Sequence, residues 1–380
     1  MTANAPRARP VPADPQRGRS PRRAPRLSTA SGFVTYLLLG LALLLPVPYM
    51  LQIPGPVFNT LGDYQGKPML SVTGAETYPT NGRLDMLTVA VSGGPGRDIF
   101  ASQALGALVG KKETVVPTEA YYPLDTTREE VAESNAHEMT SSQDVAVAAA
   151  MEELGRDYQV SLLVDEVVPG SPAEGRLRPD DRIMSVNGVR LDDDPAAAQT
   201  MSETVRSSET VDLTVHRDGR QTQVELTPET VDGQRAIGIL MRQDFEFPVD
   251  VDFNVEGIGG PSAGTMFALA IVDELTPGAM TGGRHVAGTG EIDPAGTVGP
   301  IGGARQKVAA ATAEGATLFL SPADNCAEVI AAADQSKITV ARIDTLDDAR
   351  NAVEQYAAGS TSEIPKCPAG GANPNEKGKQ

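Results

Sequence analysis

The chain has 380 residues and a formal net charge of −18, and this length allows two or three domains of ordinary size. The charge is uneven: residues 1–30 hold seven arginines against one acid, Asp14, so this arm carries about +6 and the rest about −24. A body this acidic has no surplus of Lys and Arg to neutralise phosphates, which excludes nucleic acid as its partner.

An apolar segment follows the arginine-rich arm. No charged residue lies between Arg26 and Asp63, and residues 31–53 are long enough for a transmembrane helix, which needs about 20 residues. The preceding arginines predict a cytoplasmic N-terminus and an extracytoplasmic body at the cell membrane. A cleavable signal peptide is the alternative, but no good small-x-small site follows the apolar core, so we favour a retained anchor. We expect residues 1–30 themselves to be disordered.

Residues 54–154 give fewer signals. The stretch 82–91 alternates like a strand and is followed by a glycine-rich break. Residues 127–154 predict one or two helices that end before Gly155. We assign no chemistry to this extracytoplasmic region, and its role stays open.

Short strands and turns begin near residue 158. Residues 160–168 are apolar and β-branched, and a helix is predicted over about 195–206. The segments 211–217 and 220–226 predict a hairpin joined at Asp218-Gly219, because this dipeptide favours a two-residue turn.

The motifs of this segment resemble those of a bacterial PDZ domain, to which we assign residues 155–234. They are Pro169-Gly-Ser-Pro-Ala173, Leu177, Asp180-Asp181-Arg182-Ile183 and Val186-Asn187-Gly188. The resemblance implies a β-rich domain that binds an extended peptide as an added strand beside a helix. Only Leu154-Gly155 and a short polar stretch precede the first strand, so binding of a peptide C-terminus stays open. A small structural α/β module is the alternative.

An α/β domain is predicted over residues 235–358, so the whole chain is α/β (α+β) in class. Its strands are expected at 249–255, 316–320 and 339–343, and its helices at 263–275, 304–314 and 346–356. The tail 359–380 is polar and rich in Gly and Pro, and we expect it to be disordered. Cys326 and Cys367 could form a disulfide or remain two free thiols, and the sequence leaves both alternatives open. The spacing of the two cysteines is not that of a metal site. We expect no cofactor and no metal.

Ser262 stands between a predicted strand and helix, in Gly-Ile-Gly-Gly-Pro-Ser-Ala-Gly (257–264). Glycines allow a sharp turn there, and Pro261 suits the first turn of a helix. Backbone groups of Gly260, Pro261 and Ser262 could then form an oxyanion hole at the helix start. An ordinary N-capping serine is the alternative. A phosphate-binding loop of the G-x-x-x-x-G-K-[ST] kind is absent from the chain.

Lys307 follows in Pro-Ile-Gly-Gly-Ala-Arg-Gln-Lys (300–307), on a helix with small apolar neighbours. A lysine desolvated in an apolar pocket can have its pKa lowered until it serves as the base that a serine nucleophile needs. Most helical lysines are simply solvated. A Ser-His-Asp triad with His285 and Asp293 is a further alternative, which we disfavour against a loop histidine at the start of a strand.

Three motifs together resemble the proteolytic domain of the Lon family over about residues 245–355. They are Gly260-Pro-Ser-Ala-Gly264, Thr289-Gly-Glu291 and Pro300-Ile-Gly-Gly303 with Lys307. The resemblance implies that Ser262 is the nucleophile, Lys307 the general base and Thr289 the residue that orients the lysine amine. Glu291 matches the family motif, although a surface or ion-paired acid explains it equally well.

With the anchor and the PDZ motifs, residues 31–358 resemble membrane-anchored PDZ–Lon-like proteases of Gram-positive, actinobacterial type. The chain departs from Lon enzymes at Gly259, where they commonly carry an acid, and it contains no ATPase motif. The resemblance implies an ATP-independent serine endopeptidase for exported or membrane-proximal polypeptides, with the PDZ governing access and with assembly as a hexameric ring. A catalytically silent PDZ scaffold and an esterase are the alternatives.

Overall fold

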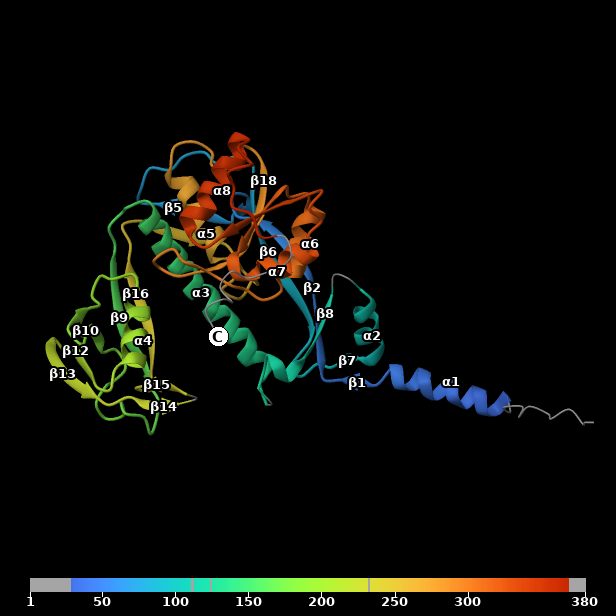
Figure 1. The fold of residues 1–380 in the computed structure, drawn as a ribbon, viewed down its shortest axis with the longest axis horizontal. Helices are drawn as coiled ribbons and strands as arrows, with labels where there is room; N and C mark the ends of the chain where they lie inside the picture. The colour runs from blue at the N-terminus through green and yellow to red at the C-terminus, as the bar shows by residue number, and fades with distance from the viewer. Residues whose placement is uncertain (1–28, 111–112, 124, 232, 369–380) are drawn as a thin grey trace, which may run out of the picture.

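The computed structural model describes residues 29–110, 113–123, 125–231 and 233–368 (Figure 1). Most of the arm expected to be disordered, residues 1–30, lies outside this range, as do residues 369–380 of the expected tail. The described chain is a mixed α/β structure with a large body and a smaller β-rich domain, and the long helix α3 (Arg128–Glu153) leads from one to the other.

A six-stranded sheet forms the centre of the body. Its order is β22 (Thr339–Ile343), β21 (Leu318–Pro322), β18 (His285–Gly288), β6 (Arg83–Gly93), β2 (Tyr49–Asn59) and β8 (Thr114–Pro117). The first four strands are parallel, and β2 pairs antiparallel with both β6 and β8. Side chains alternate along a strand, so Leu318 and Leu320 enter one apolar core and Phe319 enters the other.

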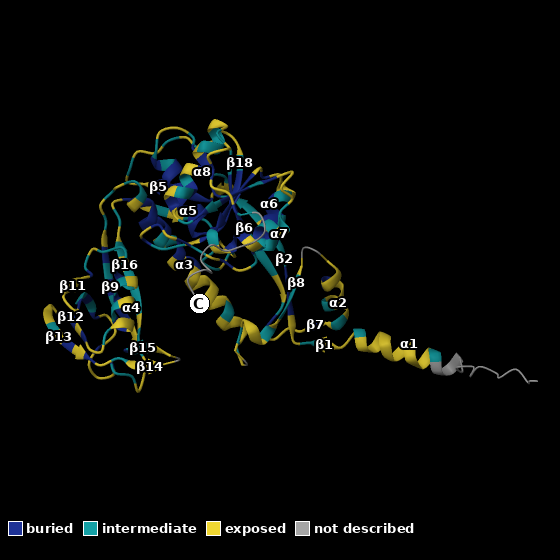
Figure 2. Cartoon of the chain, viewed as in Figure 1, coloured by how far each residue is buried: buried dark blue, intermediate teal, exposed yellow. Residues whose placement is uncertain are grey.

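Helices cover both faces of this sheet. The larger core lies under α3, α5 (Gly264–Leu275) and α8 (Leu346–Ala358). The smaller core lies under α6 (Ala304–Glu314) and α7 (Cys326–Ala332). Figure 2 shows α5 as one of the most buried elements, and Phe267 and Leu269 at its centre are fully buried.

The upstream region without an assigned chemistry is part of the body. Strands β2 and β6 stand in the central sheet, and β5 (Leu70–Thr73) pairs antiparallel with β17 (Asp250–Phe253). Helix α3 packs on α5, and it begins at a capping box in which Thr127 and Glu130 satisfy each other's backbone N–H groups. The predicted domain at 235–358 is therefore completed by residues from far upstream.

The β-rich domain is inserted between α3 and β17. Its six-stranded sheet has the order β13 (Arg220–Leu226), β12 (Val211–Arg217), β10 (Arg182–Val186), β9 (Gln159–Val167) and β16 (Ile239–Glu246), with β11 (Val189–Arg190) paired to β10. The predicted hairpin at Asp218-Gly219 is confirmed by the unbroken register of β12 with β13. Helix α4 (Ala197–Ser207) closes the sheet's apolar side. Because β16 pairs along β9, this domain extends past its predicted end at residue 234.

The predicted helix over residues 31–53 is wrong in its C-terminal part. Helix α1 spans Thr29–Leu43, 15 residues, and Tyr49–Ile53 belong to β2 in the central sheet. Pro46 and Pro48 explain the difference, since proline lacks the N–H that a continuing helix needs. None of the helices in the described part of the chain combines the length and the apolar character that crossing a membrane requires.

Residues after α8 return to the body. The backbone N–H of Arg342 donates to Pro365 O at 2.9 Å, Lys366 forms a bridge with Ala341, and Ile364 is buried in the larger core. A disulfide joins Cys326 to Cys367. Residues 364–367, part of the predicted tail 359–380, thus pack against the body, with Pro365 and Lys366 beside β22.

The remaining elements are short. They are β1 (Pro46–Val47), β3 (Asp63–Tyr64), β4 (Lys67–Pro68), β7 (Ile99–Phe100), α2 (Ala101–Val109), η1 (Thr118–Ala120), β14 (Glu229–Val231), β15 (Gln234–Ala236), β19 (Glu291–Ile292), β20 (Val298–Gly299) and η2 (Ala323–Asn325).

Candidate active site

Three separate elements bring Ser262, Thr289 and Lys307 together. Ser262 lies in the loop before α5, Thr289 directly follows β18, and Lys307 is in the first turn of α6. The Lys307 Nζ lies 2.7 Å from Ser262 Oγ and 2.9 Å from Thr289 Oγ1. The predicted contact between serine and lysine is therefore present, with the threonine beside both.

The loop that carries Ser262 is held by its neighbours on both sides. Gly260 has a φ of +89°, which favours glycine, and its N–H donates to Asn135 O on α3. Ser142 Oγ, also on α3, donates to Pro261 O at 3.0 Å. On the other side, the N–H of Gly290 donates to Ser262 O at 3.1 Å. The serine is thus positioned by α3 and by the segment after β18.

Lys307 is placed by a close approach of α6 to the sheet. Gly303, directly before α6, has a φ of +70°, and a Cβ at this position would lie 2.5 Å from Val89 Cγ2 on β6. Only glycine fits both the left-handed backbone and this contact. The Lys307 side chain is 2 % exposed, and it extends from the buried face of α6 to the serine.

Thr289 determines which hydrogen bonds the amine can make. Its single hydroxyl proton is donated to Ser262 O at 2.9 Å, so its oxygen can only accept from Lys307 Nζ. A neutral amine has two protons and one lone pair. With an N–H directed to Thr289, the lone pair remains for the proton of Ser262.

Burial lowers the pKa of Lys307 to about 7 from its ordinary 10.5, because the apolar surroundings disfavour the charged ammonium. The nearby Glu291 carboxylate acts in the opposite direction and raises the pKa of the lysine. The pKa of Glu291 is itself raised, mainly by partial desolvation and then by the charge of Glu138. A large fraction of Lys307 is therefore neutral at physiological pH.

The oxyanion hole differs from the predicted one. Pro261 has no N–H to donate, and the N–H of Gly260 is already bonded to Asn135 O. Among the described residues, the N–H groups of Ser262 and Ala263 make no hydrogen bond, and both stand at the N-terminal end of α5. These two donors can face a developing oxyanion. Ala263 was missed because the sequence did not show which N–H groups the fold leaves free.

His285 forms a different pair from the one that a triad requires. It starts β18, as expected, and its Nε2 lies 2.6 Å from Asp85 Oδ2, a buried carboxylate on β6 that also binds Arg83. Thr289 and the serine lie at the other end of β18. The alternative with His285 and Asp293 is therefore wrong.

The position three residues before the serine has no room for an acid. A Cβ on Gly259 would lie 2.9 Å from Asn135 Cβ, because α3 passes directly against the loop. Two carboxylates, Glu138 of α3 and Glu291, instead line the cavity in front of the serine. Sequence reasoning missed Glu138 because α3 carried no motif.

This cavity has a volume of about 380 Å³. Its walls come from β6, α3, the loop before α5 and the start of α6, and Met86, Val89, Met139 and Ile258 make much of the lining apolar. Ser262 and Lys307 both open onto it. The arrangement can supply a nucleophile, a buried proton acceptor and two backbone donors to a bound carbonyl group.

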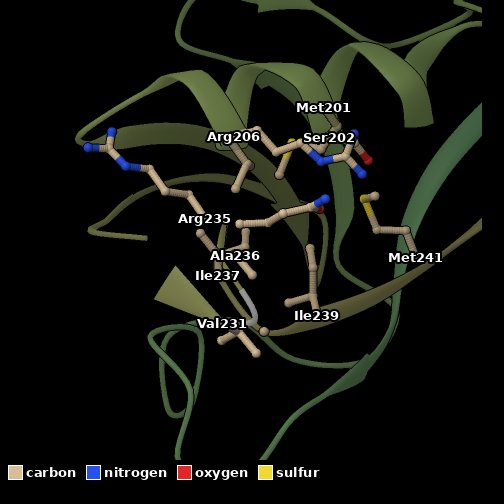
Figure 3. Close-up of a pocket in the computed structure, with 12 residues that line it drawn as sticks. Met201, Ser202, Arg206, Val231, Arg235, Ala236, Ile237, Ile239 and Met241 are labelled. Atoms are coloured by element: carbon tan, nitrogen blue, oxygen red, sulfur yellow. The ribbon is translucent and has the colours of Figure 1, made fainter. Parts of the chain in front are cut away.

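A second cavity, of about 520 Å³, lies in the β-rich domain (Figure 3). Met201, Val205 and other residues of α4 line one side, and Ile237, Ile239 and Met241 line the other. The cavity lies along β16, which is an edge strand of its sheet.

Two domain families match this chain. Residues 255–354 match the Lon protease (S16) C-terminal proteolytic domain, and residues 136–227 match the PDZ domain. Ser262, Thr289 and Lys307 all lie inside the first match.

Curated relatives are similar over part of this chain. Lon protease 1 of Bacillus subtilis (strain 168) is 42 % identical over 86 residues, which are 22 % of this chain and 11 % of that protein. Lon protease 1 of Sorangium cellulosum (strain So ce56) is 40 % identical over 92 residues, 24 % of this chain and 11 % of that protein. The matched part of the chain thus spans only about a tenth of the length of these relatives.

A solved PDZ domain, from the SdrC-like protein of Listeria monocytogenes, is 21 % identical and covers 21 % of this chain and 85 % of its own, with a TM-score of 0.19, too partial a likeness to argue from. The family matches show that the chain contains a Lon-type proteolytic domain, which is a serine peptidase domain, and a PDZ domain.

The geometry predicts that the reactivity of Ser262 depends on pH. Only neutral Lys307 can accept the serine proton, so the rate of labelling by a fluorophosphonate should rise about tenfold per pH unit below a pKa of about 7 and level off above it. Because Glu291 raises the lysine pKa, Glu291→Gln should move the rising limb to lower pH.

Glu138→Gln is the matched control for this experiment, since Glu138 lines the same cavity but is not among the groups that shift the pKa of Lys307. The rising limb of its labelling rate against pH should stay near that of the unmodified protein. A labelling rate that does not change between about pH 5 and 9 would contradict a lysine base.

Proposed function

We propose that this protein is a serine endopeptidase that uses a Ser262–Lys307 dyad. The observation that carries the proposal is the buried amine of Lys307, which lies 2.7 Å from the Ser262 oxygen and has a pKa lowered to about 7. This arrangement meets the two requirements of an activated serine, a base within reach and a base that is neutral at working pH.

In the first step, Ser262 Oγ attacks the carbonyl carbon of the scissile peptide bond while its proton moves to Lys307 Nζ. The carbonyl oxygen becomes negative and accepts hydrogen bonds from the free N–H groups of Ser262 and Ala263. The lysine ammonium then gives its proton to the leaving amine as the C–N bond breaks, which leaves an acyl-enzyme and a neutral lysine. Water attacks the ester in the same way, and Lys307 accepts its proton and returns it to Ser262.

Thr289 acts as a positioning residue in this scheme. It binds the backbone carbonyl of Ser262 and the amine of Lys307 at once, so it fixes the distance between nucleophile and base. Removal of its hydroxyl would leave the amine free to rotate away from the serine.

Replacement of either member of the dyad should abolish proteolysis. Ser262→Ala and Lys307→Met in the full chain, purified in detergent, should each lower kcat/KM on an unfolded protein by at least about 10³-fold, because neither residue has a substitute nearby. Circular dichroism should show unchanged folding.

Lys337→Met is the control, since this lysine is largely exposed and pairs only with Asp334 among the described residues. It should retain full activity. Proteolysis that survives Lys307→Met would refute the dyad, whereas polypeptide binding without turnover in the unmodified chain would favour the silent scaffold.

We further propose that the apolar segment around α1 anchors the protein at a membrane, with the arginine arm on the cytoplasmic side and the body on the other. Leu37 and Leu41 are each 59 % exposed, and α1 extends away from the body (Figure 2). Most of the large apolar side chains of α1 stay exposed, although the helix approaches α2. The disulfide between Cys326 and Cys367 fits an exported body, because cytosolic proteins seldom keep disulfides.

Substitution of the exposed leucines of α1 should release the protein from lipid. The full chain should float with liposomes that contain anionic lipid, and a Leu37→Lys and Leu41→Lys double variant should not, because charged side chains oppose burial in hydrocarbon. Leu240→Lys, at a leucine that is 52 % exposed on the PDZ domain, is the control and should float normally. Flotation of the double variant would contradict the anchor.

Substrates are then exported or membrane-proximal polypeptides, cleaved without ATP, and the PDZ domain governs their access. The support for its part is the cavity between α4 and β16, where an extended peptide could add to the free edge of β16. Met201 and Met241 in its lining can adapt to different side chains.

A charge in the PDZ cavity should impair cleavage of proteins selectively. Ile239→Asp, which places a carboxylate in the cavity, should lower kcat/KM on an unfolded protein several-fold and leave hydrolysis of a short peptide unchanged, since that peptide needs no second contact. Leu240→Asp is the control, because Leu240 is adjacent, exposed and outside the cavity lining. Equal effects of the two substitutions would contradict the role of the cavity.

A further inference from the structure

Strand β6 continues well past the end of its parallel neighbour. β18 pairs with β6 only from Arg83 to Met86, and the chain then turns away at Thr289 toward the serine. On its other edge, β6 remains paired with β2 as far as Gly93. Residues 87–93 therefore have no strand beside them, within the described parts of the chain, on the edge that β18 leaves.

This unpaired edge begins at the active site. Leu87, Thr88 and Val89 line the cavity that contains Ser262 and Lys307. An unpaired strand edge presents alternating N–H and C=O groups, which bind another extended chain.

A hollow of about 390 Å³ continues from the catalytic cavity along the same edge. The two share Val89, Asn135 and Gly259 in their lining. Beyond these residues, the hollow is lined by Val91 and Gly93 of β6 and by Arg128 and Val131 in the N-terminal part of α3. It closes where the Arg128 Nε donates to Pro95 O at 3.2 Å.

The walls of the hollow combine apolar side chains with a similar amount of polar surface. Val91 contributes from β6 and is 49 % exposed, near the C-terminal end of this 11-residue strand. Val131 of α3 and Tyr122 lie on the other side. Arg128 is the charged side chain in the lining.

We infer that the edge of β6 from Leu87 to Gly93, with α3 as its opposite wall, is a docking track for substrate residues remote from the scissile bond. A substrate segment adds to β6 as an extended strand, and one of its apolar side chains contacts Val91 and Val131. The edge is about 20 Å long, which accommodates about six extended residues. This inference rests on the proposed endopeptidase function and adds the binding mode.

A polypeptide is the occupant that these features fit. The hollow is continuous with the cavity where the scissile bond must lie, so any chain cleaved there has its flanking residues at this edge. Beyond the hollow, a further one of about 420 Å³ shares Gly94, Pro95 and Tyr122 and reaches Pro48 at the base of α1.

The kinetic test compares peptides of different length with the full chain in detergent. A cleavage site is first mapped in carboxymethylated α-lactalbumin, and a short peptide around it is extended by about six residues on either side, the length that the edge of β6 accommodates. One extended peptide should show a kcat/KM about tenfold higher than that of the short one, as a few added hydrogen bonds and an apolar contact would give.

Val91→Asp should abolish this advantage, so that the extended and the short peptide have about the same kcat/KM. Val189→Asp should leave the advantage unchanged. The control is closely matched, since Val189 is also a strand valine and is 48 % exposed, on β11 of the PDZ domain. Thermal unfolding must show that both variants fold. Equal kcat/KM for all peptide lengths would overturn the inference, as would an advantage lost in Ile239→Asp but kept in Val91→Asp.

A photo-crosslinking test does not depend on turnover. In a Ser262→Ala chain, p-benzoylphenylalanine replaces Val91 or, as the control, Val189, and labelled carboxymethylated α-lactalbumin is added. Crosslinks should form at position 91 and not at 189. Their absence at 91 would refute the track even in an active protease, whereas crosslinks at 91 without proteolysis by the unmodified chain would refute only the proposed function.

Discussion

The site depends on a lysine amine that is kept out of water. A pKa lowered from 10.5 to about 7 corresponds to on the order of 5 kcal/mol in favour of the neutral form, and burial supplies it. The same burial requires hydrogen-bond partners, which Ser262 and Thr289 provide. One feature of packing therefore makes the base neutral and holds it at the nucleophile.

The need to bury this amine explains the architecture around it. Helix α6 must lie close to the sheet, which Gly303 permits, and β18 must end early so that Thr289 can turn toward the serine. The early end of β18 also leaves one edge of β6 without a partner strand beyond Met86 in the described part of the chain. The site for the base and the open edge beside it thus have one structural origin. The PDZ domain is inserted where α3 ends, so it does not interrupt the central sheet.

The sequence predicted which motif residues lie together at the site better than it predicted the residues around them. Ser262, Thr289 and Lys307 were found because they lie in short motifs at fixed intervals, and the structure brings them within hydrogen-bond distance. The contributions of β6 and α3 could not be predicted, because Val89 and Asn135 lie more than 100 residues upstream and no motif marks them. The choice of Pro261 for the oxyanion hole was wrong for a different reason. Proline has no N–H, which the sequence already shows, whereas the bonded N–H of Gly260 and the free N–H of Ala263 depend on the hydrogen bonds of the folded loop.

The division of the first apolar segment into a helix and a strand could not be predicted from the local sequence either. Residues 31–53 read as one apolar run, yet Tyr49 and the residues after it pair with β6 and β8. Strand and helix are both compatible with a short apolar stretch, and the partner strands decide between them. Pro46 and Pro48 are the local signals that indicate where the helix stops.

The end of the chain contributes to the position of the catalytic base. Residues 364–367 lie along β22, and the disulfide from Cys367 fixes Cys326 at the start of α7. Directly before α7, the side chain of Asn325 accepts from Ile301 N at 2.8 Å and donates to Ile301 O at 2.9 Å. Ile301 leads into the loop at Gly303 from which α6 and Lys307 begin. A displacement of about 1 Å between reacting groups can cost two orders of magnitude in rate. Residues 364–367 are thus connected to the start of α6 through Cys326, Asn325 and Ile301.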